Sequence, residues 1–395
     1  MKFRSFVISL GMLGLLLQAG LAAQENSQPR YRVVELKALG GTYSQSFSLT
    51  STGVISGQAS LAGGNWHAIL WNGSSQTDLG TLGGLNSSVF GAPNAFGQVV
   101  GAAETSDPDP NGEDFCGFYA SGAPLSGTTC RGFLWHAGSM TQLPTLGGYN
   151  GAANGINSQG VVAGNAETAT PDLTCPPFNP SQGQYQVLED KPVVWENGHI
   201  HELPTYVGDP DGFAIAINDH GQVAGASGVC SAFNAIDGFY ISPVHALLWD
   251  HGRTINLGSL GGAFGNQAHG MNNRGQVVGA SDLAGDSVFY GFVWSERTGM
   301  QAIPPVLGDA YSAALGISDL GVVTGVSIDS TFTNLHAFVV VNGVTTDLNT
   351  LIPRNSPLQL LTACGINSRG EITGLAVEKS TGQYRGYLAI PIRQQ

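Results

Sequence analysis

One phrase recurs along the chain, and its repetition constrains the fold more than any other feature. Versions of it begin at residues 155 (GINSQGVVAGNA), 270 (GMNNRGQVVGAS) and 365 (GINSRGEITGLA). When the copies are aligned on the first glycine of GxVxG, that glycine falls at Gly53, Gly97, Gly160, Gly221, Gly275, Gly321 and Gly370. Seven copies at a period of a few tens of residues indicate a repeat architecture, in which each copy builds one structural unit.

Each phrase predicts a β-hairpin. An Asn stands three residues before the glycine in most copies, for example at residues 157, 218, 272 and 367, which suits the first position of a type I turn, and the glycine then takes a positive φ. A second phrase follows in each unit, such as HAILW at 67 or HALLW at 245, and a third follows in most, such as TDLGTLGG at 77. One unit therefore predicts four short antiparallel strands, buried on both faces.

Radial packing of seven such units gives a β-propeller, because each sheet then covers the faces of its neighbours. The chain carries a fourth-strand phrase before the first unit (YRVVELKALGG at 31) and ends on a third-strand phrase (YRGYLAI at 384). We therefore predict an all-β fold, a seven-bladed β-propeller of four-stranded antiparallel blades whose ring is closed by the N-terminal strand. An open solenoid is the alternative, but it would have atypical capping units at its ends. The predicted single domain spans 31–390, with blades at about 40–84, 85–148, 149–208, 209–262, 263–308, 309–351, and 352–390 plus 31–39.

The co-occurring phrases HAILW, HALLW, HAFVV, GQVVG and DLGTLGG resemble the HAF-type family of probable extracellular repeat proteins. The resemblance covers Tyr31 to Ile390 and implies bacterial export and a repeat scaffold; it brings no assigned catalytic residues. Arg131, Lys191, Tyr290 and Arg385 replace the name-giving His in four units. We therefore interpret His67, His245 and His336 as structural donors, each satisfied by a neighbouring carbonyl group. The Trp residues at the end of the same strand in five units are interpreted as packing residues.

The first residues predict a secretory signal peptide at 1–23. Lys2 and Arg4 precede an apolar run from Phe6 to Leu17, and small residues follow. No later stretch is long and apolar enough for a membrane span. The chain carries 28 acidic and 15 basic residues, a formal net charge of −13, which disfavours nucleic acid as a partner. We predict a monomer that is secreted or periplasmic.

Five cysteines are compatible with disulfides in an exported protein. Cys116 and Cys130 bracket one short insertion and are the first predicted pair, and Cys175 and Cys230 are the second. Cys364 lies within a repeat segment and is predicted to be a buried free thiol.

Three adjacent units carry long insertions between their second and third strands, at about 104–130, 167–190 and 228–243. These loops should emerge on one face of the propeller and exceed what the scaffold needs, which is typical of binding loops. Their aromatic residues are candidates for stacking on a sugar or gripping a peptide. The alternative is that they only cover apolar surface beneath the loops. These candidates are Phe115, Phe118, Tyr119, Phe178, Tyr185, Phe233, Phe239 and Tyr240.

The first insertion also resembles the first half of a calcium-binding loop. Asp107, Asp109 and Asn111 alternate and precede Gly112, but Phe118 occupies the position of the expected final acidic ligand. A structural Ca²⁺ at Asp107, Asp109 and Asn111 is one hypothesis, and an ordinary acidic surface loop is the other.

No nucleophile elbow, metal triad or phosphate loop is present, so we assign no catalytic residues and no cofactor beyond that possible Ca²⁺. The predicted function is a binding or interaction module, with a carbohydrate or protein ligand on the face that bears the insertions. A secreted carbohydrate-active enzyme, either a glycan hydrolase or a lyase, is the first alternative. A structural envelope component is the second, because propellers serve all three functions.

Overall fold

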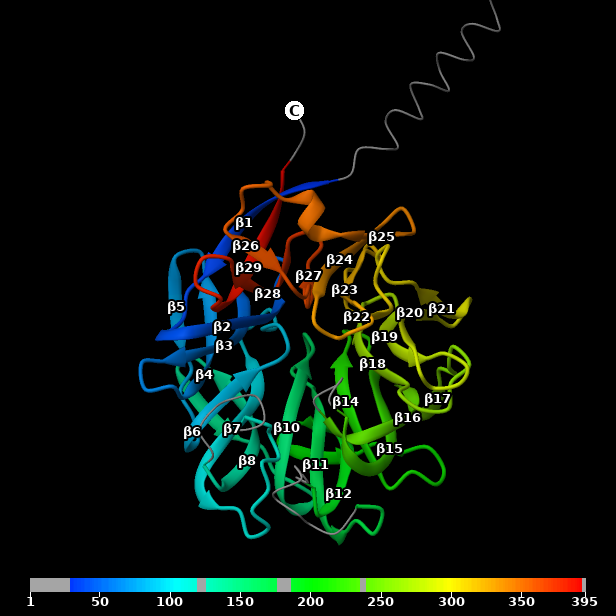
Figure 1. Cartoon of the computed structure of the whole chain (residues 1–395). Helices are drawn as coiled ribbons and strands as arrows, with labels where there is room; N and C mark the ends of the chain where they lie inside the picture. Colours follow the sequence, from blue (N-terminus) through cyan, green and yellow to red (C-terminus); the bar gives the residue numbers. More distant parts are fainter. Residues whose placement is uncertain (1–28, 119–125, 176–185, 235–238, 393–395) are drawn as a thin grey trace, which may run out of the picture.

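The computed structural model is an all-β ring of seven blades (Figure 1), and it describes residues 29–118, 126–175, 186–234 and 239–392. The blades follow one another around the ring in sequence order, as the colours of Figure 1 show. The predicted seven-bladed β-propeller is therefore confirmed. The predicted signal peptide lies outside the described residues. No helix in the described part of the chain is long and apolar enough to cross a membrane.

Six blades each contain four antiparallel strands, ordered from the inside of the ring outwards as they occur along the chain. Blades 1 to 3 are β2 (Gly40–Leu49), β3 (Ile55–Leu61), β4 (Trp66–Asn72) and β5 (Ser75–Asp78); β6 (Gly83–Val89), β7 (Val99–Pro108), β8 (Thr128–His136) and β9 (Ser139–Gln142); and β10 (Gly147–Ile156), β11 (Val162–Pro171), β12 (Leu188–Glu196) and β13 (His199–Glu202). Blades 4 to 6 are β14 (Asp211–Ile217), β15 (Val223–Asn234), β16 (Phe239–Asp250) and β17 (Arg253–Asn256); β18 (Gln267–Met271), β19 (Val277–Asp282), β20 (Phe289–Ser295) and β21 (Gly299–Ile303); and β22 (Tyr311–Ile317), β23 (Val323–Ile328), β24 (Leu335–Val341) and β25 (Val344–Asp347).

Blade 7 combines the two ends of the domain. A short 3-10 turn, η2 (Leu348–Leu351), leads into it, and its innermost position is shared by β26 (Leu358–Leu360) and β27 (Gly365–Ile366). Both pair with β28 (Ile372–Glu378), which pairs with β29 (Tyr384–Ile392). The outermost strand is β1 (Arg30–Leu36), which pairs antiparallel with β29 from Arg30 opposite Ile392 to Leu36 opposite Gly386. The N-terminal strand therefore closes the ring, as predicted.

The two glycines of GxVxG meet different steric demands. The first glycine of every copy has a positive φ, for example +70° at Gly275, which closes the inner hairpin. The second glycine lies against the backbone of the innermost strand. A Cβ at Gly279 would lie 2.0 Å from the carbonyl oxygen of Gln267, and the other six copies give 2.0 or 2.1 Å. Any side chain at this second position would push the two inner strands apart.

The turn asparagine has a second role that the turn pattern alone does not indicate. The Oδ1 atom of Asn218 accepts hydrogen bonds from the backbone N–H groups of His220 and Gln222, which holds the turn. Its Nδ2 atom donates to the carbonyl oxygen of Asn272, 3.2 Å away in the next blade. Four more bonds of this kind join neighbouring blades, from Asn94 to residue 157, Asn157 to residue 218, Asn272 to residue 318 and Asn367 to residue 50. The repeated phrase therefore ties the inner edge of the ring together.

The hydrophobic core is divided among the interfaces between blades. Each of seven buried clusters combines residues of two neighbouring blades; one of them joins Ala224 and Leu248 of blade 4 to Val277 and Phe292 of blade 5. Trp195 shows how the repeated Trp contributes, because it is buried and its Nε1 donates to the carbonyl oxygen of Pro144 in the preceding connection. Most of the described core is thus shared between neighbouring blades, so each blade depends on its neighbours for burial of its apolar faces.

The predicted partner of the repeated His was wrong. The Nδ1 atoms of His67, His245 and His336 lie 2.8 to 2.9 Å from carboxylate oxygens of Asp78, Asp209 and Asp309, and not beside carbonyl groups. The structural interpretation stands, because these pairs bind segments of the scaffold to one another.

Both expected disulfides are present, Cys116–Cys130 within blade 2 and Cys175–Cys230 between blades 3 and 4. Cys364 is a free thiol as predicted, but it is half-buried rather than fully buried, because it lines the central cavity of the ring. The second disulfide covalently joins the insertion of blade 3 to strand β15.

Candidate ligand cavity

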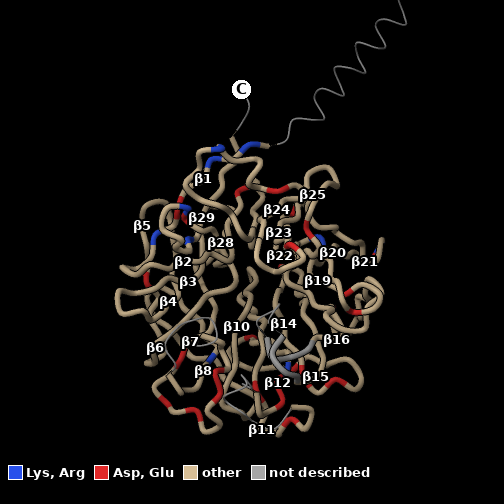
Figure 2. The backbone as a smooth tube through the Cα atoms, in the orientation of Figure 1, with Lys and Arg blue, Asp and Glu red and all other residues tan. Residues whose placement is uncertain are grey.

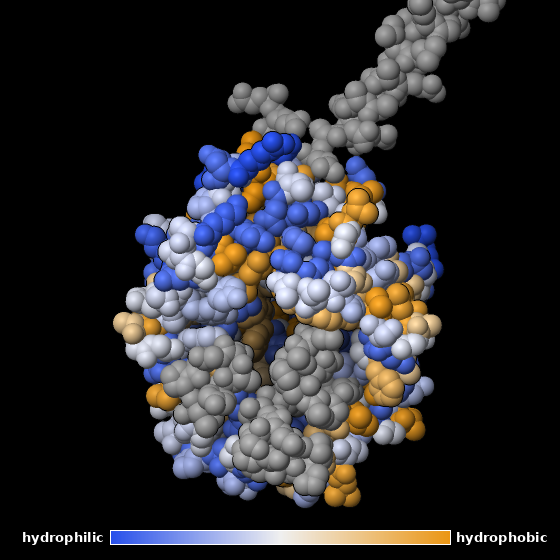
Figure 3. Space-filling view, in the orientation of Figure 1, coloured by the Kyte–Doolittle hydropathy of each residue, from blue (hydrophilic) through white to orange (hydrophobic). Residues whose placement is uncertain are grey.

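A cavity of about 1490 Å³ occupies the centre of the ring and is lined by residues from all seven blades. Figure 3 shows a hollow at the centre of the face towards the viewer. Small-molecule sites usually measure about 300–1,000 Å³, so this cavity has room for an extended ligand. It runs from the turns of the inner hairpins, near Asn218 and Asn272, to the insertion of blade 2 near Phe115.

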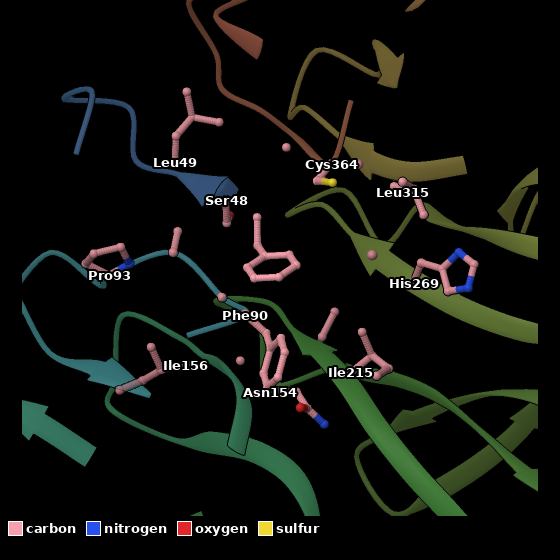
Figure 4. Close-up of a pocket in the computed structure, with 18 of the residues that line it drawn as sticks. Ser48, Leu49, Phe90, Pro93, Asn154, Ile156, Ile215, His269, Leu315 and Cys364 are labelled. Carbon is pink, nitrogen blue, oxygen red and sulfur yellow. The ribbon is translucent and has the colours of Figure 1, made fainter. Parts of the chain in front are cut away.

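Much of the wall is apolar. The residues labelled in Figure 4 lie on or next to the innermost strand of each blade, and they include Phe90, Ile215 and Leu315. Phe90 and Phe47 are both half-buried, with ring centroids 5.6 Å apart at an interplanar angle of 57°. Partly exposed aromatic faces inside a cavity are surfaces on which a ligand ring can pack.

Polar side chains form a second part of the wall, and several are joined in a chain of hydrogen bonds. Asn154 donates to Asn165 over 3.3 Å, and the Nδ2 of Asn165 donates to Asp190 Oδ2 over 2.6 Å. In blade 1, Gln58 donates to Gln45, its neighbour on the adjacent strand, over 3.4 Å. The described lining residues include the carboxyl groups of Asp190, Asp219 and Asp319 but no Lys or Arg. The wall is therefore suited to neutral polar groups rather than to anions.

The structure divides the predicted aromatic candidates into three sets. Phe115 and Phe118 line the cavity, and Phe118 is also packed in a cluster with Trp66 and Cys130. These two residues thus cover apolar surface and border the cavity at the same time. Tyr119, Phe178 and Tyr185 lie outside the described residues, and so do the side chains of Phe233, Phe239 and Tyr240 on β15 and β16.

The calcium candidates are arranged as an acidic turn. Asp107 is exposed, whereas Asp109 is buried, and its Oδ1 accepts hydrogen bonds from the backbone N–H groups of Asn111 and Gly112. Its Oδ2 accepts from Asn150 Nδ2 at 2.8 Å. A Ca²⁺ ion would have to compete with these bonds for the Asp109 oxygens.

Next to this turn, a cluster of buried carboxyl groups spans blades 2 to 4; we call Glu113, Glu167, Asp190 and Asp211 the acidic cluster. Figure 2 shows acidic segments around β8 and β12, where this cluster lies. Glu167 on β11 is directly opposite Asp190 on β12 in the strand register, and both are buried. Like charges in opposed positions of adjacent strands destabilise a sheet, so this pair is costly if both groups are ionised.

Burial raises the pKa of every member of the acidic cluster. It raises the pKa of Glu167 to about 8 with a further contribution from Asp190, and the pKa of Glu113 to about 9 with contributions from Glu167 and Asp109. Burial and the neighbouring Asp172 raise the pKa of Asp211 to about 8. Burial also places the pKa of Asp190 well above its usual range. The cluster therefore holds protons at neutral pH.

Glu104, at the equivalent position of blade 2, provides an internal comparison with Glu167. In both residues Oε2 accepts from two backbone N–H groups and one Asn side chain. The Oε1 of Glu104 also accepts from Ser126 at 2.7 Å, whereas the Oε1 of Glu167 has no hydrogen-bond partner among the described residues. Two equivalent residues of the repeat thus have different environments.

Sequence reasoning missed the acidic cluster and the amide part of the cavity wall. The available signal was the recurrence of Glu-Thr at the start of two insertions, at residues 104 and 167. That recurrence marks an equivalent position, but it does not reveal that Asp190 and Asp211 approach it from other strands. The predicted candidates were aromatic, while the most unusual chemistry of the described residues is carboxylic.

The comparisons with known proteins find similarity to solved structures only. No protein-family model matches the chain, and no curated protein matches it. An acylaminoacyl peptidase from Pyrococcus horikoshii has 10% identity and a TM-score of 0.49, and the match covers 90% of this chain and 53% of the peptidase. A sialidase from Trypanosoma rangeli, solved in complex with sialic acid, has 9% identity and a TM-score of 0.37, covering 92% of this chain and 59% of the sialidase. The chain thus spans little more than half of either protein, and similarity this low does not indicate a shared function.

Proposed function

We propose that this chain is an exported binding module that takes a neutral carbohydrate in its central cavity, from the face bearing the insertions of blades 2 to 4. The observation that carries this proposal is the composition of the cavity wall, in which the half-buried rings of Phe47 and Phe90 lie among amide side chains. Sugars pack their apolar faces on aromatic rings and exchange hydrogen bonds with amides at their edges. The resemblance to HAF-type repeats is in keeping with export.

The charge of the wall favours a neutral ligand over an anionic one. The described lining has three carboxyl groups and no Lys or Arg, and the whole chain has a formal net charge of −13. An anionic sugar or phosphate would lack a cationic partner on this wall and would be repelled over longer distances. A neutral oligosaccharide meets neither obstacle.

A glycan-cleaving enzyme is the second candidate, because one carboxyl group, Asp190, lies beside the cavity with a raised pKa. Glycoside hydrolysis generally uses two carboxyl groups about 5–10 Å apart on either side of the bond to be cleaved. The other described carboxyl groups of the lining, Asp219 and Asp319, follow β14 and β22 in the turns of the inner hairpins, at the end of the blades opposite the insertions. This separation favours binding over cleavage.

The test is binding of labelled protein, residues 24–395, to an array of polysaccharides and cell-surface glycans with and without Ca²⁺. Phe90→Ala should weaken any glycan hit at least tenfold, because it removes an aromatic surface from the cavity. Phe96→Ala is the matched control, since Phe96 is 69% exposed and is not among the lining residues. Incubation of the bound glycan with protein then tests for cleavage. A blank array would refute the carbohydrate proposal and favour a protein partner or a structural role in the envelope.

A further inference from the structure

The innermost strands share an irregularity at one position of the repeat. In blades 1, 3, 4, 5 and 6 the pairing of the first two strands skips one residue, for example between Ala214 and Ala216 in blade 4. The skipped residue stands six places before the first glycine of GxVxG, as Ile215 does before Gly221. Such a β-bulge leaves one residue unpaired and redirects its side chain, and bulges are frequent next to functional sites.

The residues at this position all line the central cavity, and we call them the belt. One comes from each blade, in ring order Phe47, Gly91, Asn154, Ile215, His269, Leu315 and Cys364. Figure 4 shows Asn154, Ile215, His269 and Leu315 as an arc along neighbouring innermost strands. The belt is therefore a set of equivalent positions around one cavity.

The scaffold restricts the residue beside the belt but not the belt itself. The residue that follows the belt is Gly, Ala or Ser in every blade. A Cβ at Gly316 would lie 2.8 Å from the carbonyl oxygen of Cys364 in the next blade, and one at Gly270 would lie 3.1 Å from that of Leu315. The belt, in contrast, has a different residue type in each of the seven blades. A position that the scaffold leaves free and that lines a cavity is suited to determining which ligand binds.

The two polar members of the belt, Asn154 and His269, use their donors within the scaffold. The Nδ2 of Asn154 donates to the carbonyl oxygen of Ala214 at 2.8 Å and to Asn165 at 3.3 Å, and the Nδ1 of His269 lies 3.0 Å from the carbonyl oxygen of Ala314. A carbonyl oxygen only accepts, so this Nδ1 carries a proton. Burial lowers the pKa of His269, which leaves its Nε2 with a free lone pair. The atoms that remain for a ligand, Asn154 Oδ1 and His269 Nε2, are both acceptors.

Both acceptors are accessible from the cavity that their residues line. Neither has a hydrogen-bond partner among the described residues. The side-chain atoms that the protein encloses without a partner include Asp190 Oδ1 but neither of these two. Ile215 lies between them in the order of the blades and Leu315 follows, and both aliphatic residues are half-buried. From blade 3 to blade 6 the belt therefore alternates between an acceptor and an aliphatic side chain.

We propose that the belt selects carbohydrates with acetamido groups over those with only hydroxyl or amino groups in the same places. This selectivity rests on the proposed function and names the class of sugar that the cavity takes. An acetamido group combines one N–H donor with a methyl group. The N–H donates to an acceptor of Asn154 or His269 while the methyl group packs on Ile215 or Leu315. A hydroxyl group offers the donor without the apolar surface, and an ammonium group would lose its hydration beside aliphatic side chains.

The experiment compares three hexasaccharides that share a β-1,4 backbone and differ only in the group on carbon 2. They are chitohexaose with acetamido groups, cellohexaose with hydroxyl groups and the glucosamine hexamer with amino groups. Binding is measured by calorimetry at pH 6, where most of these amino groups are charged. Chitohexaose should bind at least tenfold more tightly than cellohexaose, since one added methyl-sized group in an apolar site is worth about tenfold or more. The glucosamine hexamer should bind no more tightly than cellohexaose.

Two variants test whether the belt is the source of this preference. Leu315→Ala and Ile215→Ala remove aliphatic surface and leave both acceptors in place. Each should lower the affinity for chitohexaose about five- to tenfold and change that for cellohexaose less than about twofold. Leu320→Ala is the matched control, because Leu320 belongs to the same blade as Leu315, is 65% exposed and is not among the lining residues. Melting temperatures of all variants establish that they are folded.

The outcomes separate the two proposals. If no hexasaccharide binds and the glycan array is blank, the carbohydrate function fails and the selectivity of the belt fails with it. If cellohexaose binds as tightly as chitohexaose, or if the glucosamine hexamer binds most tightly, the protein binds carbohydrate but the belt does not select acetamido groups. The same conclusion follows if both alanine variants keep the wild-type preference, or if only other glycans of the array bind.

Discussion

Because the carboxyl groups of the acidic cluster have raised pKa values, we predict that the protein becomes less stable as the pH rises from 5 to 8. Glu167 carries the argument, because burial raises its pKa from 4.5 to about 8. Between these values the folded state holds a proton that the unfolded state has released. The free energy of unfolding therefore decreases with pH in this window, and the stabilising contribution is complete only below the unfolded pKa.

The magnitude follows from the number of protons retained. One proton held by the folded state and not by the unfolded state changes the free energy of unfolding by about 1.4 kcal/mol per pH unit. Over three pH units the loss is about 4 kcal/mol for a single proton. Asp190 and Asp211 shift in the same direction, so they add to this loss and do not offset it.

Urea denaturation at pH 5, 6.5 and 8 measures the effect, and Glu167→Gln isolates it. The amide cannot ionise, so the variant should lose less stability than wild type between pH 5 and pH 8, by up to about 4 kcal/mol. Glu104→Gln is the matched control, because both carboxylate oxygens of Glu104 already accept hydrogen bonds. A wild-type stability that is constant or rises over this range would refute the reasoning, as would an unchanged slope in Glu167→Gln.

Three further predictions concern the ring and its loops. Asn218→Ala should cost about 1–3 kcal/mol in urea denaturation, because it leaves buried groups in its own turn and in the next blade without partners; His220→Ala, in the same turn, should cost less than half of that. Amides of β1 that pair with β29 should be as protected in hydrogen exchange as those of β28, and rapid exchange across residues 31–36 would contradict closure of the ring. Addition of 1 mM Ca²⁺ should leave the melting temperature unchanged, because both oxygens of Asp109 already accept hydrogen bonds; a rise that Asp109→Asn abolishes would instead establish the Ca²⁺ site.

The fold could be predicted from the sequence because the residues that determine it lie close together in the chain and recur in every unit. The phrase around Gly275 encodes a hairpin within a dozen residues, and seven copies make the pattern unmistakable. The fourth-strand phrase at 31 and the missing fourth strand after 384 then indicate closure. The interblade bond from Asn218 to Asn272 could not be predicted in this way, because the turn pattern explains the Asn completely without it.

The acidic cluster could not be predicted, because the residues that form it are neither close together in the sequence nor repeated from blade to blade. Glu167, Asp190 and Asp211 lie on three strands of two blades, and each alone is typical of an exposed strand end or loop. Contacts between the insertions of blades 2 and 3 contribute to the cluster; Glu113 accepts a hydrogen bond from the backbone N–H of Val187 at 2.6 Å. Such contacts depend on loop conformations for which the repeat gives no template.

The contrast between repeated and non-repeated residues also indicates where the candidate site lies. A propeller needs equivalent residues in every blade for packing, so a residue that serves only the scaffold can be the same throughout the ring. Glu104 and Glu167 begin as equivalents and differ in whether Ser126 or an equivalent donor satisfies the second oxygen. In blade 3 that second oxygen has no hydrogen-bond partner among the residues that the structure describes, and the opposing residue, Asp190, is one of those that line the cavity. The departure from the repeat therefore places costly buried groups directly behind the cavity wall, which is the physical reason to seek function at blades 2 to 4 before the rest of the ring.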